Sequence, residues 1–165
     1  MAIFLERPNI KKGYLLIEKD VLRDEYKEIL KHISLERRFR AKESLFTVLK
    51  REVESHQKVL SFASLKSEID LSLINEFLIK EKKLFLPKVI EGEIRTEIDY
   101  DCILVPGLAF DKKGFRLGRG GGHYDKLLAK YENVYTIGVC FNEQITLSDL
   151  PTESHDKRVQ KVCAF

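Results

Sequence analysis

The sequence has only three cysteines, Cys102, Cys140 and Cys163, and each stands inside a run of apolar residues. Neither their number nor their spacing fits a disulfide framework or a zinc site, so we expect buried, reduced thiols. Long apolar stretches are also missing. The N-terminus has no segment of signal-peptide length behind a basic start, and nothing later approaches a membrane span. We therefore expect a cytoplasmic protein with no membrane partner.

A strong excess of one charge is lacking as well. The net charge is +3 and the isoelectric point is near 8.7, well short of the dense cationic surface that binding to a phosphate backbone requires. This balance favours small-molecule substrates and argues against nucleic acid. The chain has no internal repeat and no flexible linker. With 165 residues, 44% of them hydrophobic, it is predicted to form one globular domain over residues 1–165, and we expect a monomer.

The spacing of apolar residues predicts alternating helices and strands. Apolar residues recur at helical intervals in four segments: 18–32, 35–53 with Ser34 as its N-cap, 71–78 and 124–131. Apolar runs of strand length occupy 59–63, 84–87, 102–106 and 135–141, with a final one at 159–164, and 93–98 alternates like a hairpin or edge strand. This order implies an α/β fold. We expect a Rossmann-like three-layer sandwich with a mostly parallel, mixed central sheet and helices on both faces.

Glycine is scarce except in one place. Four of the nine glycines fall within Gly118-Arg119-Gly120-Gly121-Gly122, after a predicted strand and directly before a helix. Glycine permits a positive φ and lets ligand oxygens approach the backbone amides, and the helix N-terminus attracts anions. Arg116 and Arg119 add guanidinium groups that match phosphate oxygens. The segment predicts a phosphate-binding loop rather than a flexible turn with solvated arginines.

The two common nucleotide-binding motifs are absent from this loop. A GxGxxG motif beginning at Gly118 would need glycine at the position of His123, and a Walker A loop would need Lys-Ser or Lys-Thr after its last glycine. The loop therefore belongs to another class. Shortly before it, the residues from Asp111 to Gly114 have the pattern of a type I turn.

Two acids and two bases outside the loop have alternative interpretations. Asp125, in the first turn of the following helix, either stabilises the helix dipole by about 0.3–1 kcal/mol or holds Mg²⁺ against phosphates. Asp156 could complete a metal pair, although its spacing alone indicates an ordinary turn aspartate. Lys19 and Arg23, four residues apart, share one helical face, and such pairs usually belong to a solvated face.

The segment from Ile103 to Asp111, with Gly114, Arg-Leu-Gly-Arg-Gly-Gly-Gly at 116–122 and then Tyr124-Asp125, resembles the 5-formyltetrahydrofolate cyclo-ligase family, also called methenyltetrahydrofolate synthetases. Weaker matches agree in order, namely Lys19 with Arg23, Glu68, Leu86-Pro87, Phe141 with Gln144, and Pro151 with His155-Asp156. The resemblance runs from about Lys19 to the last residue. Residues 1–17 form an N-terminal extension of unknown role.

The resemblance implies cyclisation of 5-formyltetrahydrofolate to 5,10-methenyltetrahydrofolate, with ATP and Mg²⁺, through a phosphorylated formyl group and with release of ADP and phosphate. It implies that ATP is bound by Lys19, Arg23, Arg116, Leu117, Gly118, Arg119, Gly120, Gly121, Gly122, His123 and Tyr124. It implies that the folate is bound by Ala63, Glu68, Arg119, Gly120, Gly121, Gly122 and His123. Arg119 and Tyr124 are the expected catalytic residues, and Asp125 and Asp156 the expected metal ligands.

His123 departs from the family pattern, which usually has a second tyrosine there, so a smaller titratable ring replaces a bulky aromatic surface. Two other functions remain compatible with the residues. The first is an α/β enzyme for sugar phosphates or CoA esters that binds substrate phosphate in the glycine loop and consumes no ATP. The second is a non-catalytic RNA-binding module, against which stand the modest charge and the lack of a basic and aromatic surface pattern.

Overall fold

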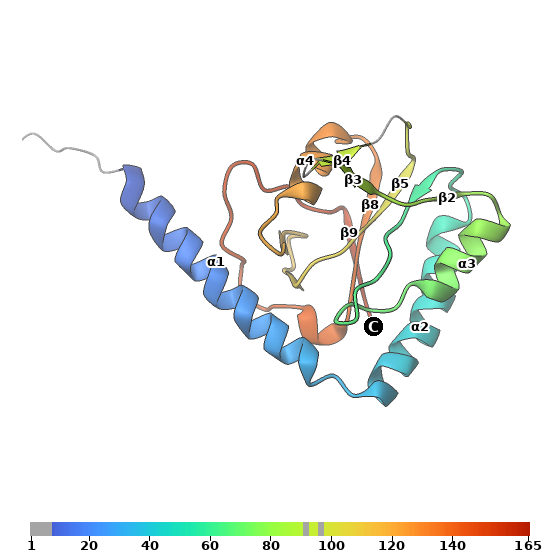
Figure 1. Cartoon of the computed structure of the whole chain (residues 1–165), viewed down its shortest axis with the longest axis horizontal. Helices are drawn as coiled ribbons and strands as arrows, with labels where there is room; N and C mark the ends of the chain where they lie inside the picture. Colours follow the sequence, from blue (N-terminus) through green and yellow to red (C-terminus); the bar gives the residue numbers. More distant parts are fainter. Residues whose placement is uncertain (1–7, 91–92, 96–97) are drawn as a thin grey trace, which may run out of the picture.

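The structure is a computed structural model that describes residues 8–90, 93–95 and 98–165. The helices are α1 (Pro8–Lys31), α2 (Leu35–Val53), α3 (Ser72–Lys80) and α4 (His123–Lys130), with a 3-10 helix η1 (Asn142–Gln144). The strands are β1 (Val59–Leu60), β2 (Leu84–Phe85), β3 (Lys88–Ile90), β4 (Glu93–Arg95), β5 (Cys102–Val105), β6 (Ala109–Phe110), β7 (Arg116–Leu117), β8 (Tyr135–Cys140) and β9 (Lys161–Ala164). Figure 1 shows the strands in the middle of the molecule and α1 along one edge.

Five strands form a central sheet in the order β2-β1-β5-β8-β9, and every neighbouring pair is parallel. The prediction of a mostly parallel central sheet is confirmed. The antiparallel pairing expected of a mixed sheet is found outside this central sheet. Antiparallel pairing in the described part of the chain belongs to two small separate sheets, β3 with β4 and β6 with β7. In the sheet β2 lies on one side of β1, and the next strand along the chain to join the sheet, β5, lies on the other side of β1. The sheet therefore has its switch point between β1 and β5.

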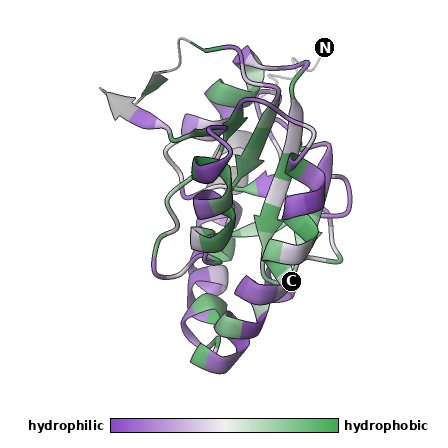
Figure 2. Ribbon diagram, turned by 90° about the vertical axis from the view of Figure 1, so that its right-hand side faces the viewer, coloured by the Kyte–Doolittle hydropathy of each residue, from purple (hydrophilic) through white to green (hydrophobic). Residues whose placement is uncertain are grey.

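Alternate residues of the central strands enter two different hydrophobic clusters. Val59 of β1 and Leu104 of β5 pack in one cluster with buried residues of α2 and α3, whereas Leu60 and Ile103 pack in a second cluster with Leu127 of α4. Figure 2 shows the hydrophobic strands inside the molecule, with helices to either side. The predicted α/β sandwich with helices on both faces is thus confirmed, since a parallel sheet must be covered on both sides.

The two long helices follow the predicted apolar spacing. α1 begins at Pro8 instead of Glu18, because proline is well tolerated in the first turn of a helix, where its missing N–H is not needed. Ser34 caps α2 as predicted, and its Oγ accepts a hydrogen bond from Arg37 N at 3.2 Å. Across the described residues, no helix has the length and apolarity that a membrane crossing requires.

Several predicted strands are shorter in the structure. The run 59–63 is a strand only over β1, because after Ser61 N bonds Phe85 O the backbone turns away, and Phe62 O accepts from the Asn75 side chain. The alternating run 93–98 supplies β4, the second strand of a hairpin with β3, while residues 96–97 lie outside the described residues. The turn at Asp111 is present, with Gly114 N donating to Asp111 O at 3.1 Å.

The three cysteines lie on neighbouring strands of the central sheet. Cys102 is on β5, Cys140 on β8 and Cys163 on β9, and all are buried and free. Burial raises the pKa of the Cys102 thiol to about 12, and it raises the pKa of Cys140 as well. The expected buried thiols are confirmed.

Candidate active site

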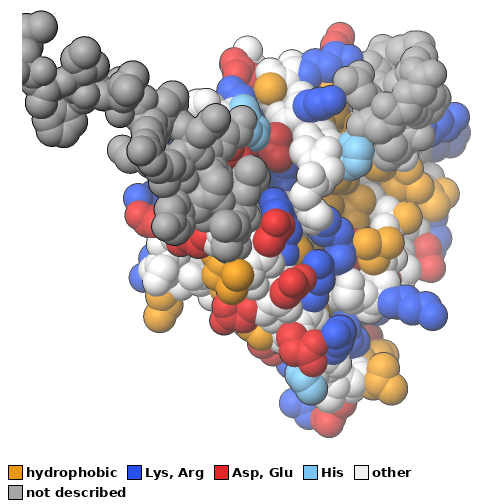
Figure 3. Space-filling view, turned by 60° about the vertical axis from the view of Figure 1, so that its left-hand side comes forward, with side chains coloured by type: hydrophobic (Ala, Val, Ile, Leu, Met, Phe, Trp, Pro, Cys, Tyr) orange, Lys and Arg blue, Asp and Glu red, His pale blue; other side chains and the backbone are white. Residues whose placement is uncertain are grey.

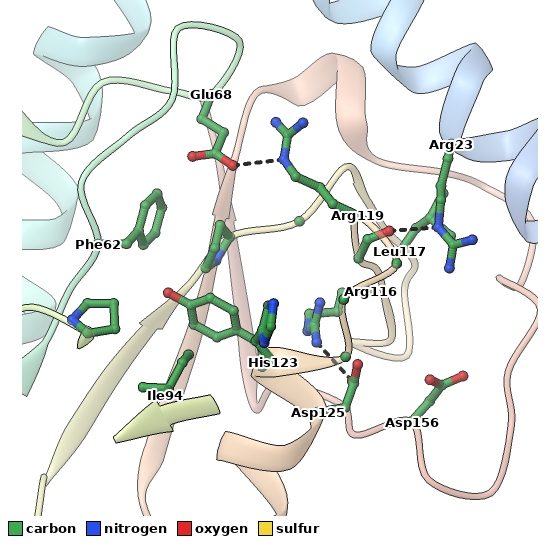
Figure 4. A pocket seen from close by; sticks show the side chains of 18 of the residues that line it. Arg23, Phe62, Glu68, Ile94, Arg116, Leu117, Arg119, His123, Asp125 and Asp156 are labelled. Atoms are coloured by element: carbon green, nitrogen blue, oxygen red, sulfur yellow. Dashed lines mark hydrogen bonds and ion pairs between the residues drawn. The ribbon is translucent and has the colours of Figure 1, made fainter. Parts of the chain in front are cut away.

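A cavity of about 740 Å³ opens beyond the carboxyl ends of three central strands. Residues within three positions of the ends of β1, β2 and β5 line it: Phe62 and Ala63, Leu86 and Pro87, and Pro106 and Gly107. This edge lies at the switch point of the sheet, where open parallel sheets commonly bind their ligands. The remaining walls come from α1, the glycine loop, the start of α4 and the segment between β8 and β9 (Figure 4).

Every residue that the sequence predicted for the site lines this one cavity. They are Lys19, Arg23, Ala63, Glu68, all residues from Arg116 to Asp125, and Asp156. The sequence reasoning did not assign to the site the apolar lining and two polar groups, although it matched some of them to the family pattern. They are Phe62, Leu65, Leu86, Pro87, Ile94, Pro106, Gly107, Glu153 and His155. Several of these lie at the carboxyl ends of predicted strands, and that position was the signal that could have found them.

The glycine loop joins β7 to α4. Gly120 and Gly122 have φ values of +105° and +64°, which side chains with a Cβ rarely adopt, and Gly122 is the N-cap of α4. His123 begins the helix, and its ring folds back over the loop, since a Cβ on Gly121 would lie 2.6 Å from His123 Nε2. The loop is therefore a tight backbone turn at a helix N-terminus, as an anion cradle requires.

Arg116 is held almost out of solvent at the floor of the cavity. Its Nη2 lies 2.8 Å from Asp125 Oδ1, and only 4% of its side chain is exposed. The guanidinium also lies 5.7 Å from the centre of the Tyr124 ring. Burial lowers the pKa of Arg116 although the Asp125 carboxylate opposes this. Arg116 Nε is buried and has no hydrogen-bond partner among the described residues, so it retains a donor for a ligand oxygen.

Lys19 and Arg23 connect α1 to the cavity. Lys19 is buried, and its Nζ lies 2.6 Å from Asp156 Oδ2 and 3.2 Å from Glu153 Oε2. Arg23 Nε donates to Gly118 O in the glycine loop at 3.0 Å. The spacing alone favoured a solvated helix face for Lys19 and Arg23, and that prediction is wrong. At these residues α1 packs against the glycine loop and the segment between β8 and β9.

The carboxylates at this end of the cavity are suited to a divalent cation. Ligand atoms of Glu153, His155 and Asp156 lie within 4.8 Å of one another. Burial alone would raise the pKa of Asp156, but the hydrogen bond and charge of Lys19 and the backbone N–H of Glu153 outweigh it and lower the net value. Figure 4 shows Asp125 and Asp156 on the same side of the cavity. Asp156 is therefore ionised at neutral pH.

Arg119 points in the other direction, towards the loop between β1 and α3. Its Nε lies 3.3 Å from Glu68 Oε1, and its Nη2 donates to Ser67 Oγ at 2.8 Å. Glu68 Oε2 accepts from Leu65 N at 2.9 Å. Burial raises the pKa of the Tyr124 phenol, so this phenol keeps its proton at neutral pH.

The cavity thus has two chemically different halves. The phosphate half, defined by Lys19, Arg23, Arg116, Gly118 to Gly122, Asp125 and Asp156, is cationic with carboxylates at its edge. The apolar half, defined by Phe62, Leu65, Leu86, Ile94 and Pro106, carries the single carboxylate of Glu68. In Figure 3, blue basic groups, red acids and orange apolar groups meet on one face of the molecule. Such a cavity can hold an anion and a largely apolar ligand side by side.

Comparison with known proteins bears on the family of the chain. A model of the 5-formyltetrahydrofolate cyclo-ligase family matches residues 90–164. The 5-formyltetrahydrofolate cyclo-ligase of Mus musculus is 30% identical over an alignment 186 positions long, gaps included, which covers 86% of this chain and 90% of the mouse protein.

Two solved structures share the fold. The 5,10-methenyltetrahydrofolate synthetase of Aquifex aeolicus has a TM-score of 0.76 and 31% identity, and the match covers 87% of this chain and 88% of the other. That of Mycoplasma pneumoniae has a TM-score of 0.76 at 22% identity, with 88% and 97% covered. The similarity to the mouse protein extends over most of both sequences, and the architecture agrees. The chain therefore belongs to the 5-formyltetrahydrofolate cyclo-ligase family of ligase enzymes, as the sequence predicted.

Proposed function

We propose that this chain converts 5-formyltetrahydrofolate to 5,10-methenyltetrahydrofolate with consumption of ATP in the presence of Mg²⁺. The observation that carries the proposal is that one cavity contains both the phosphate half and the apolar half, which meet at the glycine loop. A reaction that transfers a phosphoryl group to a folate needs both ligands next to each other. The names of the relatives in this family support the same substrate.

The apolar half suits the folate. Phe62, Leu86 and Ile94 offer an apolar wall against which a flat pteridine ring can pack. The Glu68 carboxylate can accept hydrogen bonds from ring N–H groups, and its side chain is only 10% exposed. A carboxylate that is this well buried accepts strong, oriented hydrogen bonds.

The phosphate half suits the triphosphate. Phosphoryl transfer depends chiefly on in-line positioning and on neutralisation of charge, with little covalent help from the protein. The unpartnered Arg116 Nε, the amides of the glycine loop and the amine of Lys19 supply donors for phosphate oxygens. No protein nucleophile is needed.

The carboxylates fit Mg²⁺, which binds oxygen ligands from one or two acids together with phosphate oxygens and water. Asp125 and Asp156 would hold the ion. In the structure Asp156 is grouped with Glu153 and His155, whereas Asp125 pairs with Arg116. When bound, the ion neutralises charge on the phosphates. The lowered pKa of Asp156 supports this role, since a metal ligand must be deprotonated.

The proposed reaction has two stages. The formyl oxygen on N5 attacks the γ-phosphorus of ATP and ADP leaves, which turns a poor leaving group into a phosphate. N10 then attacks the formyl carbon, the carbon–oxygen bond breaks, phosphate departs and N10 loses its proton. In this proposal Arg119 would leave its contact with Glu68 to neutralise the transferred phosphoryl group, and the protonated Tyr124 phenol would donate a hydrogen bond to that group.

The test is an assay of the purified chain with 5-formyltetrahydrofolate and Mg·ATP, followed by the absorbance of the methenyl product. We expect product that depends on both ATP and Mg²⁺. If the folded protein forms no product, the proposal is refuted. Calorimetry provides a second check, because an enzyme that uses the loop only for a substrate phosphate would show no magnesium-dependent ATP binding.

A further inference from the structure

The ion pair of Arg119 with Glu68 joins the two halves of the cavity. Two other ion pairs of site residues, Arg116 with Asp125 and Lys19 with Asp156, lie within the phosphate half. Arg119 instead extends from the glycine loop to a loop 51 residues earlier in the sequence. Any ligand that binds Arg119 Nε or Glu68 Oε1 must break this ion pair.

The contact occupies both partners. Arg119 uses Nε on Glu68 and Nη2 on Ser67, and Glu68 uses Oε1 on Arg119 and Oε2 on Leu65 N. In Figure 4 the guanidinium of Arg119 points to Glu68 and away from the pair formed by Arg116 and Asp125. An arginine held in this way does not present the same N–H groups to a phosphate. A carboxylate held in this way does not present Oε1 to the folate.

We propose that Ser67 and Glu68 hold Arg119 on the folate side until the nucleotide binds, so that nucleotide binding frees Glu68 for the folate. This inference rests on the proposed function. Because both ligands must break the same contact, whichever ligand binds first removes that cost for the second. The coupling is therefore positive, and thermodynamic linkage makes it equal in both directions. Ser67 acts here as a positioning residue that contacts Arg119.

Ser67→Ala tests the inference because it removes the hydroxyl that accepts from Arg119 Nη2 and leaves Glu68 in place. Calorimetry would measure the Kd of 5-formyltetrahydrofolate with and without Mg²⁺ and a non-hydrolysable ATP analogue. In the wild type we expect roughly threefold to tenfold tighter folate binding with the analogue, the size of one typical net hydrogen bond. In Ser67→Ala the ratio should fall towards one, because folate binds more tightly without nucleotide and unchanged with it.

Two variants serve as controls. Ser64→Ala makes the same truncation in the same loop, where the hydroxyl accepts from Leu71 N at 3.1 Å, and it should keep the wild-type ratio. Ser67→Thr keeps a hydroxyl and should restore the ratio. An equal ratio in the wild type and Ser67→Ala would overturn the inference, as would a wild-type ratio of one. Either result would leave an active enzyme, whereas failure of the proposed function would appear as absence of product in the wild type.

Discussion

Arg116 Nη2 lies 2.8 Å from Asp125 Oδ1, in a pair whose side chains are 4% and 18% exposed. The arginine stands on β7, before the glycine loop, and the aspartate stands in the first turn of α4, after it. The pair therefore spans the base of the loop. Asp125 therefore has an ion-pair partner in Arg116, which neither of the two roles considered for it, helix-dipole stabilisation and metal binding, requires.

The first prediction concerns Asp125→Asn. The amide keeps an oxygen for Arg116 but loses the charge that a metal ligand needs, so we expect turnover to fall by about 100-fold or more. The free energy of unfolding should fall by only about 1–3 kcal/mol, the cost of weakening one charged hydrogen bond. Turnover across a magnesium titration and urea unfolding measure the two effects. Asp149→Asn, an exposed partner of Lys113, is the matched control, and a variant that unfolds but keeps its activity per folded molecule would favour the dipole role.

The second prediction concerns pH. The pKa of Asp156 is lowered from 3.8 in the folded chain, so its ionised form contributes stability above the unfolded pKa, and this contribution is lost as the pH falls through the folded pKa. The difference in free energy of unfolding between the wild type and Asp156→Asn should be constant above about pH 5 and shrink below pH 3.8. Urea unfolding at several pH values checks this. Asp24→Asn, at an exposed pair with Lys27, should show little difference at any pH; a difference for Asp156→Asn that grows in acid would contradict the argument.

The third prediction compares two glycines with positive φ. Gly114 and Gly122 have φ values of +83° and +64°. A Cβ on Gly114 would lie 2.4 Å from Val159 O, whereas a Cβ on Gly122 would have no heavy atom within 4 Å. We expect Gly122→Ala to lower the free energy of unfolding by about 1–2 kcal/mol from backbone conformation alone. Gly114→Ala should cost about 4 kcal/mol or more, because two backbone segments must separate. Equal losses in chemical denaturation would show that the close approach has no cost.

The fourth prediction concerns His123→Tyr. The histidine ring lies over Gly121 and lines the cavity, and a tyrosine would restore the larger aromatic surface usual in the family. We expect the Kd of 5-formyltetrahydrofolate to fall or to stay the same, with turnover within a few-fold of the wild type, about the effect of one aromatic contact. Calorimetry and the product assay measure both. A large loss would mean that the histidine has acquired a role of its own.

The sequence predicted those parts of the fold that depend on local pattern. Ser34 was recognisable as a cap because serine directly before a helical apolar pattern commonly caps a helix, and its hydroxyl does accept from Arg37 N. β8 was recognisable because residues 135–141 form a hydrophobic run of strand length. The length of β1 was not predictable, since an apolar run continues past Leu60 while the backbone leaves the sheet to line the cavity.

The partners of the site cations were equally hidden. Lys19 meets Asp156 across 137 residues of sequence, and Arg119 meets Glu68 across 51. Spacing along a helix shows that Lys19 and Arg23 share a face, but it cannot show what that face contacts. Only the family resemblance assigned those residues to a site, and tertiary packing supplies the physical reason.

The three cysteines of the central sheet are buried, and we expect them to react slowly with thiol reagents. Alkylating reagents react with the thiolate, and a Cys102 thiol with a pKa of about 12 supplies almost none at neutral pH. Because Cys102, Cys140 and Cys163 stand on three adjacent strands, their modification requires the sheet to open. The rate of alkylation in the native protein would therefore report the opening of the core, with no introduced label.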